Sequence, residues 1–390
     1  MTTDLTWTYH LNRLAGTLGG PSATRAGPGT VGFLGNPASL TTINPLDSLT
    51  GTPLDGIGSW DGDVLRINGS DVTVQDCLLN TILYHGSGTN MTVQNCIINA
   101  PAPGDPGSGF SAISQSSVDR GTLTVLDCTI TCATAGTSVV STAVASEYRM
   151  IMRRCDVSGS GDGIHTVGIP GSTYTDGSII DSCYIHDLSF LDEAQHLDAI
   201  QLFNADVNNT TTDTFCLIQN CRTDASYGPS GEAMNSGLTV GTSPDDQVGL
   251  KIQAKIDNNA FNSGAYHLRV GYRTANVQVT GNNFGTFTPS GPHAEFGLVD
   301  VSDPTAITLW KNNRTATGFT VTFPGVTDTS SGAVTESLVS AANIWAGTSG
   351  LSLAGALNVK AGTTGLTVVA CLNSIAGTTG LTAVDAASRI

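Results

Sequence analysis

Charged side chains are scarce in this 390-residue chain, and basic ones are outnumbered by acidic ones. Asp, Glu, Lys and Arg occupy 12% of the positions, and 16 Lys and Arg against 32 Asp and Glu leave a net charge of −16. So few basic residues exclude a basic surface that coats nucleic acid or an anionic membrane. No apolar run approaches the roughly 18 residues of a transmembrane helix. The first residues lack the basic and apolar segments of a signal peptide, so we expect no secretion by that route.

Glycine is abundant by contrast, at 46 positions, and one short frame recurs along the chain. The frame reads apolar, two polar residues, Cys, any residue, apolar, and Asn replaces the Cys in the later copies. The copies span residues 77–312 at an average spacing of about 29 residues, which is typical of a protein built from stacked coils. The recurring residues are Cys77, Cys96, Cys128, Cys155, Cys183, Cys221, Asn259, Asn282 and Asn312.

This recurring small residue indicates a ladder inside a parallel β-helix. Each coil of such a fold lies about 4.8 Å from the previous one, so equivalent side chains stack. An inward position at a bend accepts Cys, or an Asn that bonds along the stack. We therefore predict an all-β solenoid of about nine or ten coils over residues 51–316, with cysteines that pack in the core. Nine Cys is an odd total, which argues against a disulfide framework and favours a reducing cytoplasm.

A second frame follows each bend and predicts which residues stack on one face of the coils. The spacing between the two frames varies, so one loop per coil varies in length. We expect loops such as Pro101–Gly109 and Ser189–Gln195 to lie on one flank, where such proteins place recognition surfaces. The copies of this frame are Ser111-Ala112-Ile113, Thr142-Ala143-Val144, Asp162-Gly163-Ile164, Asp198-Ala199-Ile200, Ser236-Gly237-Leu238, Tyr266-His267-Leu268 and Phe296-Gly297-Leu298.

The end of the chain carries a different repeat, with a period of 15 residues over positions 343–390. Its pattern, Asn-x-x-Ala-Gly-Thr-Thr-Gly-Leu, predicts short helices at Leu351–Ala361 and Leu366–Ala376, each followed by Gly. Residues 12–19 contain the same phrase once more. Such short units bury little apolar surface alone, so we interpret them as assembly elements. Residues 1–50 are then an attachment or capping segment, and residues 317–342 a linker or β segment.

The end repeats resemble the tails of minor tail proteins from bacteriophages that infect actinobacteria. Residues 50–315 resemble right-handed parallel β-helix proteins of the pectate-lyase-like class, which includes phage tailspikes. The resemblance implies a right-handed β-helix and a virion protein of the phage tail, made in the host cytoplasm. It also implies other tail proteins as partners, a homotrimer, and contact with a host cell-surface glycan during adsorption, with neither nucleic acid nor membrane as partner.

The densest polar constellation lies on the coils around Cys155 and Cys183. The second frame stacks Asp162–His165 on Asp198–Gln201. Two carboxylates one coil apart are about 5 Å from each other, a separation compatible with glycoside cleavage. A His-x-Asp-x-x-Gln pattern at residues 196–201 also resembles that of β-helix proteins associated with carbohydrate-active enzymes. The candidate catalytic residues are Asp162, Asp198, His165 and His196, and the candidate glycan-binding residues are Gln201, His186, Asp187, Tyr266 and Arg269.

Other interpretations of the stacked carboxylates stay open. In these interpretations the carboxylates are exposed to solvent, bind a cation such as Ca²⁺, or accept hydrogen bonds from backbone N–H groups at turns. Basic residues that would neutralise a uronate in a lyase are sparse, with Arg269 and Arg273 the nearest. Two hypotheses follow: a receptor-binding tail protein without chemistry, which we favour, and a tail-borne polysaccharide depolymerase, a glycoside hydrolase or lyase. We expect no cofactor and no resident metal, with Ca²⁺ as the alternative.

Overall fold

The computed structural model divides the chain into two compact units, of which one comprises Thr24–Leu309 with Asn313–Val326 and the other includes Thr327–Ile390. Each unit is described by itself below. The described residues are 26–27, 29–102, 111–115, 121–135, 138–168, 177–189, 197–204, 215–224, 234–241, 251–262, 264–285, 297–315, 321, 351–375, 377 and 379–380.

Three sheets of parallel strands make up the first unit, together with two antiparallel pairs. Within the described residues, sheet C has nine strands and sheet A has ten. Sheet C consists of β4 (Val72–Gln75), β7 (Met91–Gln94), β10 (Thr122–Leu126), β15 (Arg149–Arg153), β18 (Ile179–Asp181), β21 (Cys216–Gln219), β24 (Ala254–Asp257), β27 (Val277–Thr280) and β30 (Ile307–Lys311). Sheet A consists of β1 (Thr41–Ile43), β5 (Cys77–Leu79), β8 (Ile97–Ala100), β11 (Thr129–Cys132), β16 (Asp156–Ser158), β19 (Tyr184–His186), β22 (Arg222–Asp224), β25 (Ala260–Asn262), β28 (Asn283–Phe284) and β31 (Arg314–Thr315).

Sheet B carries the second frame. It begins with the antiparallel pair β2 and β3 and continues with parallel strands; β12 (Thr134–Ala135) and β13 (Ser138–Val139) form a separate hairpin. Short 3₁₀ helices occupy Pro37–Ser39 and Pro304–Ala306. Sheet B consists of β2 (Gly58–Asp61), β3 (Val64–Asn68), β6 (Ile82–Ser87), β9 (Ser111–Gln115), β14 (Thr142–Ser146), β17 (Asp162–Gly168), β20 (Ile200–Asn204), β23 (Ser236–Val240), β26 (Tyr266–Val270) and β29 (Gly297–Val301).

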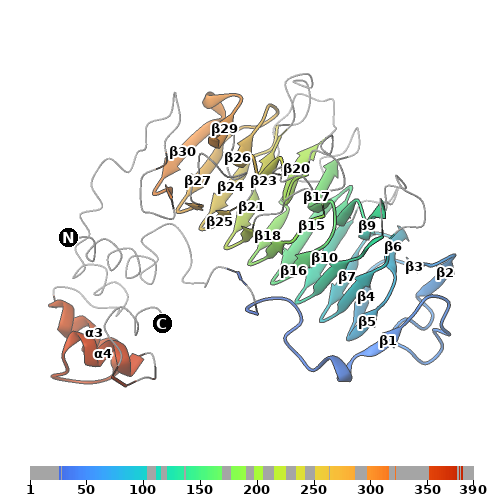
Figure 1. Ribbon diagram of the computed structural model, residues 1–390, viewed down its shortest axis with the longest axis horizontal. Helices are drawn as coiled ribbons and strands as arrows, with labels where there is room; N and C mark the ends of the chain where they lie inside the picture. The colour runs from blue at the N-terminus through green and yellow to red at the C-terminus, as the bar shows by residue number, and fades with distance from the viewer. Residues whose placement is uncertain are drawn as a thin grey trace. The chain divides into compact units, whose positions relative to one another are not determined.

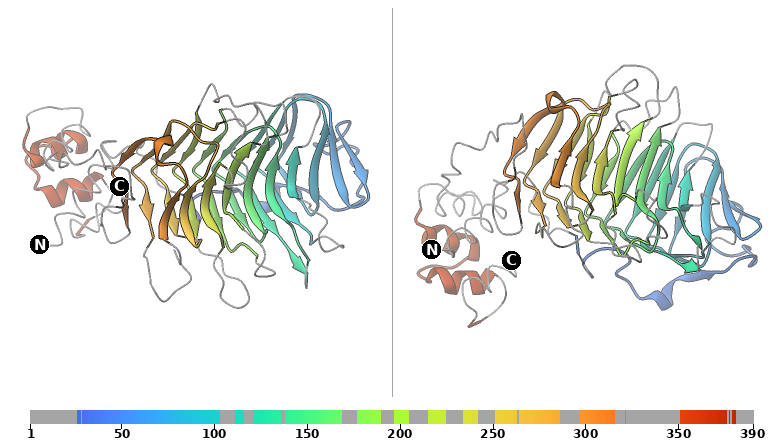
Figure 2. Two further views of the ribbon diagram at one scale, coloured as in Figure 1. Left: turned by 90° about the horizontal axis from the view of Figure 1, so that it is seen from above. Right: turned by 45° about the horizontal axis from the view of Figure 1, so that its top comes forward.

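The chain passes from sheet C to sheet A to sheet B and then returns to the next strand of sheet C. Thus β4, β5 and β6 form one coil, and β7, β8 and β9 pair with them in parallel as the next coil. Figures 1 and 2 show the resulting stack of coils along the unit. Stacked coils with equivalent residues in register are the arrangement of a parallel β-helix. The predicted all-β parallel β-helix is confirmed.

The ladder cysteines lie inside these coils. Cys77, Cys96, Cys128, Cys155, Cys183 and Cys221 are each fully buried, and all nine cysteines of the chain are buried free thiols. Each ladder thiol lies close to the carbonyl oxygen two residues earlier, as Cys155 Sγ does to Arg153 O at 3.2 Å. The predicted packing of the cysteines in the core is confirmed.

The bend between sheets C and A is made by the residue just before the ladder. Asp76, Asn95, Asp127, Arg154, Ser182, Asn220, Asn258, Gly281 and Asn312 all have positive φ, between 52° and 64°. Asn, Asp and Gly adopt this left-handed conformation most readily, which explains their prevalence at this position. Arg154 is held there by a bidentate ion pair with Asp127, at 2.6 and 2.7 Å.

Asparagines continue the ladder after Cys221. Asn259 Nδ2 donates to Asn282 Oδ1 at 3.0 Å, and Asn282 Nδ2 donates to Asn313 Oδ1 at 3.0 Å. The sequence frame assigned the last ladder position to Asn312, and this assignment is wrong by one residue. Asn312 instead takes the left-handed bend, because the large side chain of Trp310, 1% exposed, fills the inward position of β30.

The chain before β1 runs back across sheet A. Ala26 N donates to Asn220 O at 3.0 Å, Gly32 N donates to Arg154 O at 2.8 Å, and Phe33 N donates to Thr129 Oγ1 at 2.9 Å. Residues 26–27 and 29–33 therefore cross successive coils, and Ala26 and Val31 pack with Tyr184 of β19. We call residues 26–27 and 29–33 the strap.

Helices α3 (Leu353–Ala361) and α4 (Val368–Ile375) belong to the second unit. They begin two residues later than the predicted ranges, and Ser352 caps α3 by accepting from Gly355 N. Gly362 ends α3 in the left-handed conformation, as the repeat predicted. Asn358 Nδ2 donates to Leu366 O at 2.9 Å, and Asn358 Oδ1 accepts from Leu366 N at 3.0 Å, so the repeated Asn joins one helix to the next turn. No helix among the described residues has the length and apolar character needed to span a membrane.

Candidate functional site

Most of the predicted site residues lie together on sheet B, where β17, β20, β23, β26 and β29 are neighbours (Figure 1). His165 pairs with Gln201, and Asp198 forms an isolated bridge with Ser236. The stacking predicted for these coils is thus observed. We call the following set the polar strip: Asp162, His165, Asp198, Gln201, Asn235, Ser236, Thr239, Tyr266, Arg269 and Asp300.

The last coil has a different register from the one predicted. The second frame aligned Phe296 with Tyr266, but Tyr266 pairs with Gly297, and Arg269 with Asp300. The predicted alignment is therefore wrong by one residue in this coil. The observed register places Asp300 Oδ2 3.0 Å from Arg269 Nε, an ion pair that the predicted register would have lost.

In the coils of β17, β20 and β23, the second position of the second frame is a small residue, and this determines how the neighbouring side chains are arranged. Gly163 and Ala199 are buried, and a Cβ atom added at Gly163 would lie 2.3 Å from Ala199 O, so only glycine fits there. Because these small residues face the inside of the coil, the side chains of the first and fourth residues of a frame can approach each other on the opposite side of the strand. In the coil of β23, Ser236 Oγ and Thr239 Oγ1 are 2.6 Å apart.

Asp198 is the best-held carboxylate of the strip and is 1% exposed. Its Oδ1 accepts hydrogen bonds from the Ser236 hydroxyl, from Asn235 Nδ2 at 3.0 Å and from Thr239 Oγ1 at 3.2 Å. Burial raises the pKa of Asp198 to about 6, while these donors and the charge of Arg269 oppose the rise. Asp198 is therefore mostly ionised at neutral pH.

Asp162 is the second carboxylate of the pair. Its Oδ1 accepts a hydrogen bond from the backbone N of Asp198 at 2.8 Å. Burial raises the pKa of Asp162 to about 7, the bond from Asp198 N lowers it, and the negative charge of Asp198 raises it further. A carboxylic acid that is half-protonated near pH 7, beside an ionised carboxylate, is chemically suited to donate a proton.

The cationic end of the strip is Arg269. Its Nε donates to Asp300 Oδ2 at 3.0 Å, and its Nη1 lies 3.4 Å from Asn235 Oδ1. Its guanidinium also lies 5.9 Å from the ring centre of Tyr266. Because Asn235 also donates to Asp198, these bonds join the carboxylate side of the strip to its cationic side.

The predicted histidines do not form one group. His165 is in the strip, and burial lowers its pKa to about 4, so it is neutral at pH 7. His186 lies on sheet A instead, where Nε2 contacts Asp156 Oδ1 at 2.8 Å and Nδ1 contacts Asp187 Oδ2 at 2.7 Å. Its ring stacks on Tyr184 with centroids 4.2 Å apart. His186 and Asp187 are thus separated from the strip, and His196 lies outside the described residues.

Sequence reasoning missed Asn235, Ser236, Thr239 and Asp300 as members of the site. Thr239 occupies the fourth position of its frame, as His165 does, so the frame itself contained the signal. Asn235 precedes its frame by one residue, and Asp300 belongs to the coil whose register was misassigned. In the part of the chain that the structure describes, no three His, Cys, Asp or Glu side chains are grouped as a metal ion requires.

Comparisons with known proteins leave this site as the main guide to function. No protein-family model matches the chain, and no curated protein is significantly similar to it.

Proposed function

We propose that the protein is a minor tail protein of a bacteriophage and that its polar strip contacts a host cell-surface polysaccharide. The observation that carries the glycan-binding part is the convergence of amide, hydroxyl, carboxylate and aromatic groups along successive coils of sheet B. Hydroxyl-rich ligands are recognised by such a mixture of planar polar groups and an aromatic ring. Strands about 4.8 Å apart repeat these groups along the coils, which suits an extended polymer.

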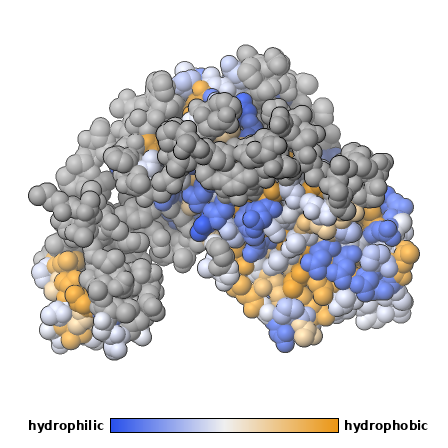
Figure 3. Space-filling model, in the orientation of Figure 1, coloured by the Kyte–Doolittle hydropathy of each residue, from blue (hydrophilic) through white to orange (hydrophobic). Residues whose placement is uncertain are grey.

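The helical repeats support the tail-protein part of the proposal. Leu351, Val359, Leu366 and Val369 are 36–50% exposed. Figure 3 shows apolar residues gathered on the surface of this helical pair. Exposed apolar surface on a small unit favours docking on another protein. The resemblance of these repeats to phage tail proteins makes other tail components, or further copies of this chain in a homotrimer, the expected partners.

The glycan-binding part is tested by titrating the full chain with a panel of bacterial capsular and cell-wall polysaccharides. We expect one glycan to bind, and the double variant Gln201→Ala/Tyr266→Ala to lose about tenfold in affinity. Gln219→Ala, an equivalent change on sheet C, serves as the control and leaves affinity unchanged. Equal binding by the strip variant and the control would refute the assignment. Immunogold labelling of phage particles tests location, and label confined to the capsid or absent from particles would contradict a tail protein.

A depolymerase is the second candidate, because Asp162 and Asp198 are adjacent and both have pKa values near neutrality. In this mechanism Asp162 protonates the leaving glycosidic oxygen, and Asp198 acts as the nucleophile or activates water. Release of new reducing ends from the bound glycan is the assay. Cleavage that is lost in both Asp162→Asn and Asp198→Asn would support the enzyme, whereas intact glycan after prolonged incubation with the wild type would exclude it.

A further inference from the structure

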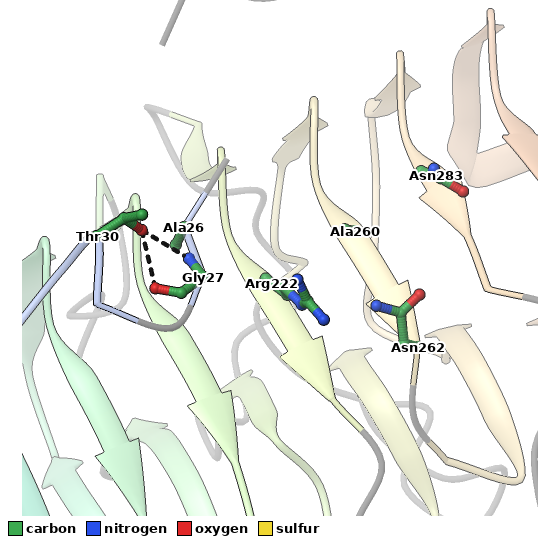
Figure 4. Close-up of a pocket in the computed structure, with 7 residues that line it drawn as sticks. All are labelled: Ala26, Gly27, Thr30, Arg222, Ala260, Asn262 and Asn283. Atoms are coloured by element: carbon green, nitrogen blue, oxygen red, sulfur yellow. Dashed lines mark hydrogen bonds between the residues drawn. The ribbon is translucent and has the colours of Figure 1, made fainter. Parts of the chain in front are cut away.

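A pocket of about 450 Å³ lies on sheet A, on a different sheet from the polar strip. The lining residues come from the strap and from three successive coils. They are Ala26, Gly27, Thr30, Arg222, Ala260, Asn262 and Asn283 (Figure 4). The volume is within the range of sites for small ligands.

The pocket exists because one position in an outward column of side chains is small. Arg222 pairs with Ala260, and Ala260 pairs with Asn283, so the three residues follow one another on β22, β25 and β28. The methyl group of Ala260 leaves a gap between its larger neighbours. Two coil spacings separate the strands of Arg222 and Asn283 by about 9.6 Å, which is about the span of one pyranose ring with its substituents.

Arg222 is held in a fixed position at one wall. Its Nε donates to Asp224 Oδ1 at 2.7 Å, and its guanidinium lies 5.5 Å from the ring centre of Tyr184. Asp224 is itself held by two further donors, since Oδ2 accepts from Tyr184 Oη at 2.7 Å and Oδ1 also accepts from Asn262 Nδ2 at 2.9 Å. Figure 4 shows Arg222 projecting from its strand toward the strand that carries Asn262.

Nε of Arg222 donates to Asp224, whereas Nη1 and Nη2 at the outer edge of the guanidinium have no hydrogen-bond partner among the residues that the structure describes. A methyl group added at Gly27 would lie 3.6 Å from Nη1, in van der Waals contact, so the strap borders this edge of the guanidinium. A preorganised guanidinium with two adjacent N–H groups that no described residue engages matches a carboxylate, which accepts both in parallel.

The opposite wall supplies an acceptor that lacks a donor. Asn283 Oδ1 is buried and, in the described part of the chain, meets no hydrogen-bond donor. A buried acceptor without a partner costs about 1–3 kcal/mol, and rotation of this amide toward the pocket would let a ligand hydroxyl offset that cost. Among the described residues, Asn262 makes a side-chain hydrogen bond only through its amide nitrogen, to Asp224. The pocket thus presents a carboxylate-binding edge at one wall and amides suited to hydroxyl groups elsewhere.

We propose that this pocket binds one acidic monosaccharide unit, with its carboxylate on Arg222 and its hydroxyl groups on Asn262 and Asn283. The site is independent of the polar strip and of what the strip binds. A hexuronate carries a carboxylate and several hydroxyl groups on one ring, whereas inorganic phosphate and acetate offer only the anion.

The test is titration of the full chain with glucuronate, followed by isothermal calorimetry or ligand-observed NMR. We expect glucuronate to bind. Glucose should bind about tenfold more weakly because it lacks the carboxylate, and acetate about tenfold more weakly because it lacks the hydroxyl groups. Inorganic phosphate that binds as tightly as glucuronate would show that the site recognises an anion only and would overturn the proposal.

Variants separate this pocket from the rest of the surface. Arg222→Gln removes the cation, and Ala260→Leu fills the gap while leaving the Arg222–Asp224 pair in place; each should weaken glucuronate binding about tenfold. Arg314→Gln, on the next coil after Asn283, is the matched control and retains wild-type affinity. If either of these variants fails to fold, Gly27→Ala narrows the pocket beside Arg222 by a single methyl group. Unchanged affinity in Ala260→Leu or Gly27→Ala, or lost affinity in Asp162→Asn, would place the binding site elsewhere.

Discussion

The Oδ1 atom of Asp162 accepts a hydrogen bond from the backbone N of Asp198 at 2.8 Å. One carboxylate therefore holds the backbone of the residue that carries the other carboxylate, one coil away. Both side chains are withdrawn from water, and burial is the main cause of the raised pKa of each. Asp162 thus accepts a backbone hydrogen bond, and both carboxylates have the raised pKa values of an acid–base pair. The two properties can be tested separately.

Replacing Asp162 by Asn should stabilise the protein at pH 8 but not at pH 4. The pKa of Asp162 rises from 3.8 to about 7 on folding, so the folded state binds a proton more tightly than the unfolded state between these values. The stability that this group contributes is present below about pH 4 and is lost as pH rises to about 7. The Asn side chain has no charge to desolvate and still offers an oxygen to Asp198 N. We expect a gain of up to about 4 kcal/mol at pH 8, since the pKa rises by about three units and each unit corresponds to about 1.4 kcal/mol.

Chemical unfolding of both proteins at pH 4, 6 and 8 measures this difference. Asp303→Asn, at a half-buried position that caps the second 3₁₀ helix, is the control. A gain that is equal at all three pH values would contradict the assigned cause, because burial of the charged form acts only when the carboxylate ionises.

His186 should produce a pH dependence in a higher window. The pKa of His186 is raised, first by its hydrogen bond with Asp156 and then by Asp187, against the effect of burial. Protonated His186 therefore stabilises the folded state fully below its unfolded pKa of about 6.5, and this contribution is lost as pH rises through the folded value. His186→Gln should be less stable than the wild type at pH 6, with a smaller difference at pH 9. Thermal unfolding at both pH values is the measurement, and a difference that grows toward pH 9 would contradict it.

The repeating frames allowed the coils and part of the site to be predicted. A small residue every 29 or so positions can stack only in a ladder, so the inward placement of the cysteines followed from spacing alone. The pairing of His165 with Gln201 followed in the same way. The last ladder position was misassigned because Asn312 and Asn313 are adjacent asparagines, and the burial of Trp310 decides between them.

The rest of the site depends on where the chain turns. His186 was expected near Asp162 because both coils are adjacent in sequence. Asp187 takes a φ of 47° at the end of β19, so the chain leaves sheet A only after His186. The pocket beside Arg222 was not predicted at all, because it depends on the strap, which reaches sheet A from a distant part of the sequence. The spacing of the frames predicts the register between neighbouring coils, but it does not predict that the strap, a segment from elsewhere in the chain, covers them.

The asparagine ladder should be worth more to stability than the cysteine ladder. Asn282 Oδ1 accepts from both the backbone N and the Nδ2 of Asn259, and its own Nδ2 donates to Ile256 O at 2.9 Å. Asn282→Ala leaves these buried groups without partners, and we expect a loss of about 3 kcal/mol or more. Cys155→Ala removes only a weak thiol contact and a small volume, so it should lose about 1 kcal/mol. Urea unfolding compares the two, and equal losses would contradict the hydrogen-bonded role of Asn282.

The left-handed bend at Arg154 should tolerate Asn but not Val. Arg154 has a φ of 52°, which a β-branched side chain adopts only with strain. Its ion pair with Asp127 is about half-exposed on both sides and contributes about 1 kcal/mol or less. Arg154→Asn should therefore change stability by less than about 1 kcal/mol, whereas Arg154→Val should lose about 2 kcal/mol. Val tolerated as well as Asn in thermal unfolding would show that the bend conformation is not what restricts this position.

Asn358 should hold the helical repeats together independently of the β-helix. Its Nδ2 donates to Ala354 O at 2.7 Å and to Leu366 O at 2.9 Å, while its Oδ1 accepts from Leu366 N at 3.0 Å. Asn358→Ala leaves the groups around Leu366 without these partners, at a cost of about 2–3 kcal/mol to a unit with little buried surface. Hydrogen exchange should then speed up in α3 and α4 while the strands of sheets A, B and C keep wild-type protection, and Ser374→Ala in α4 is the control. Faster exchange in the sheets as well would mean that the two units unfold together and that the repeats are not a separate assembly element.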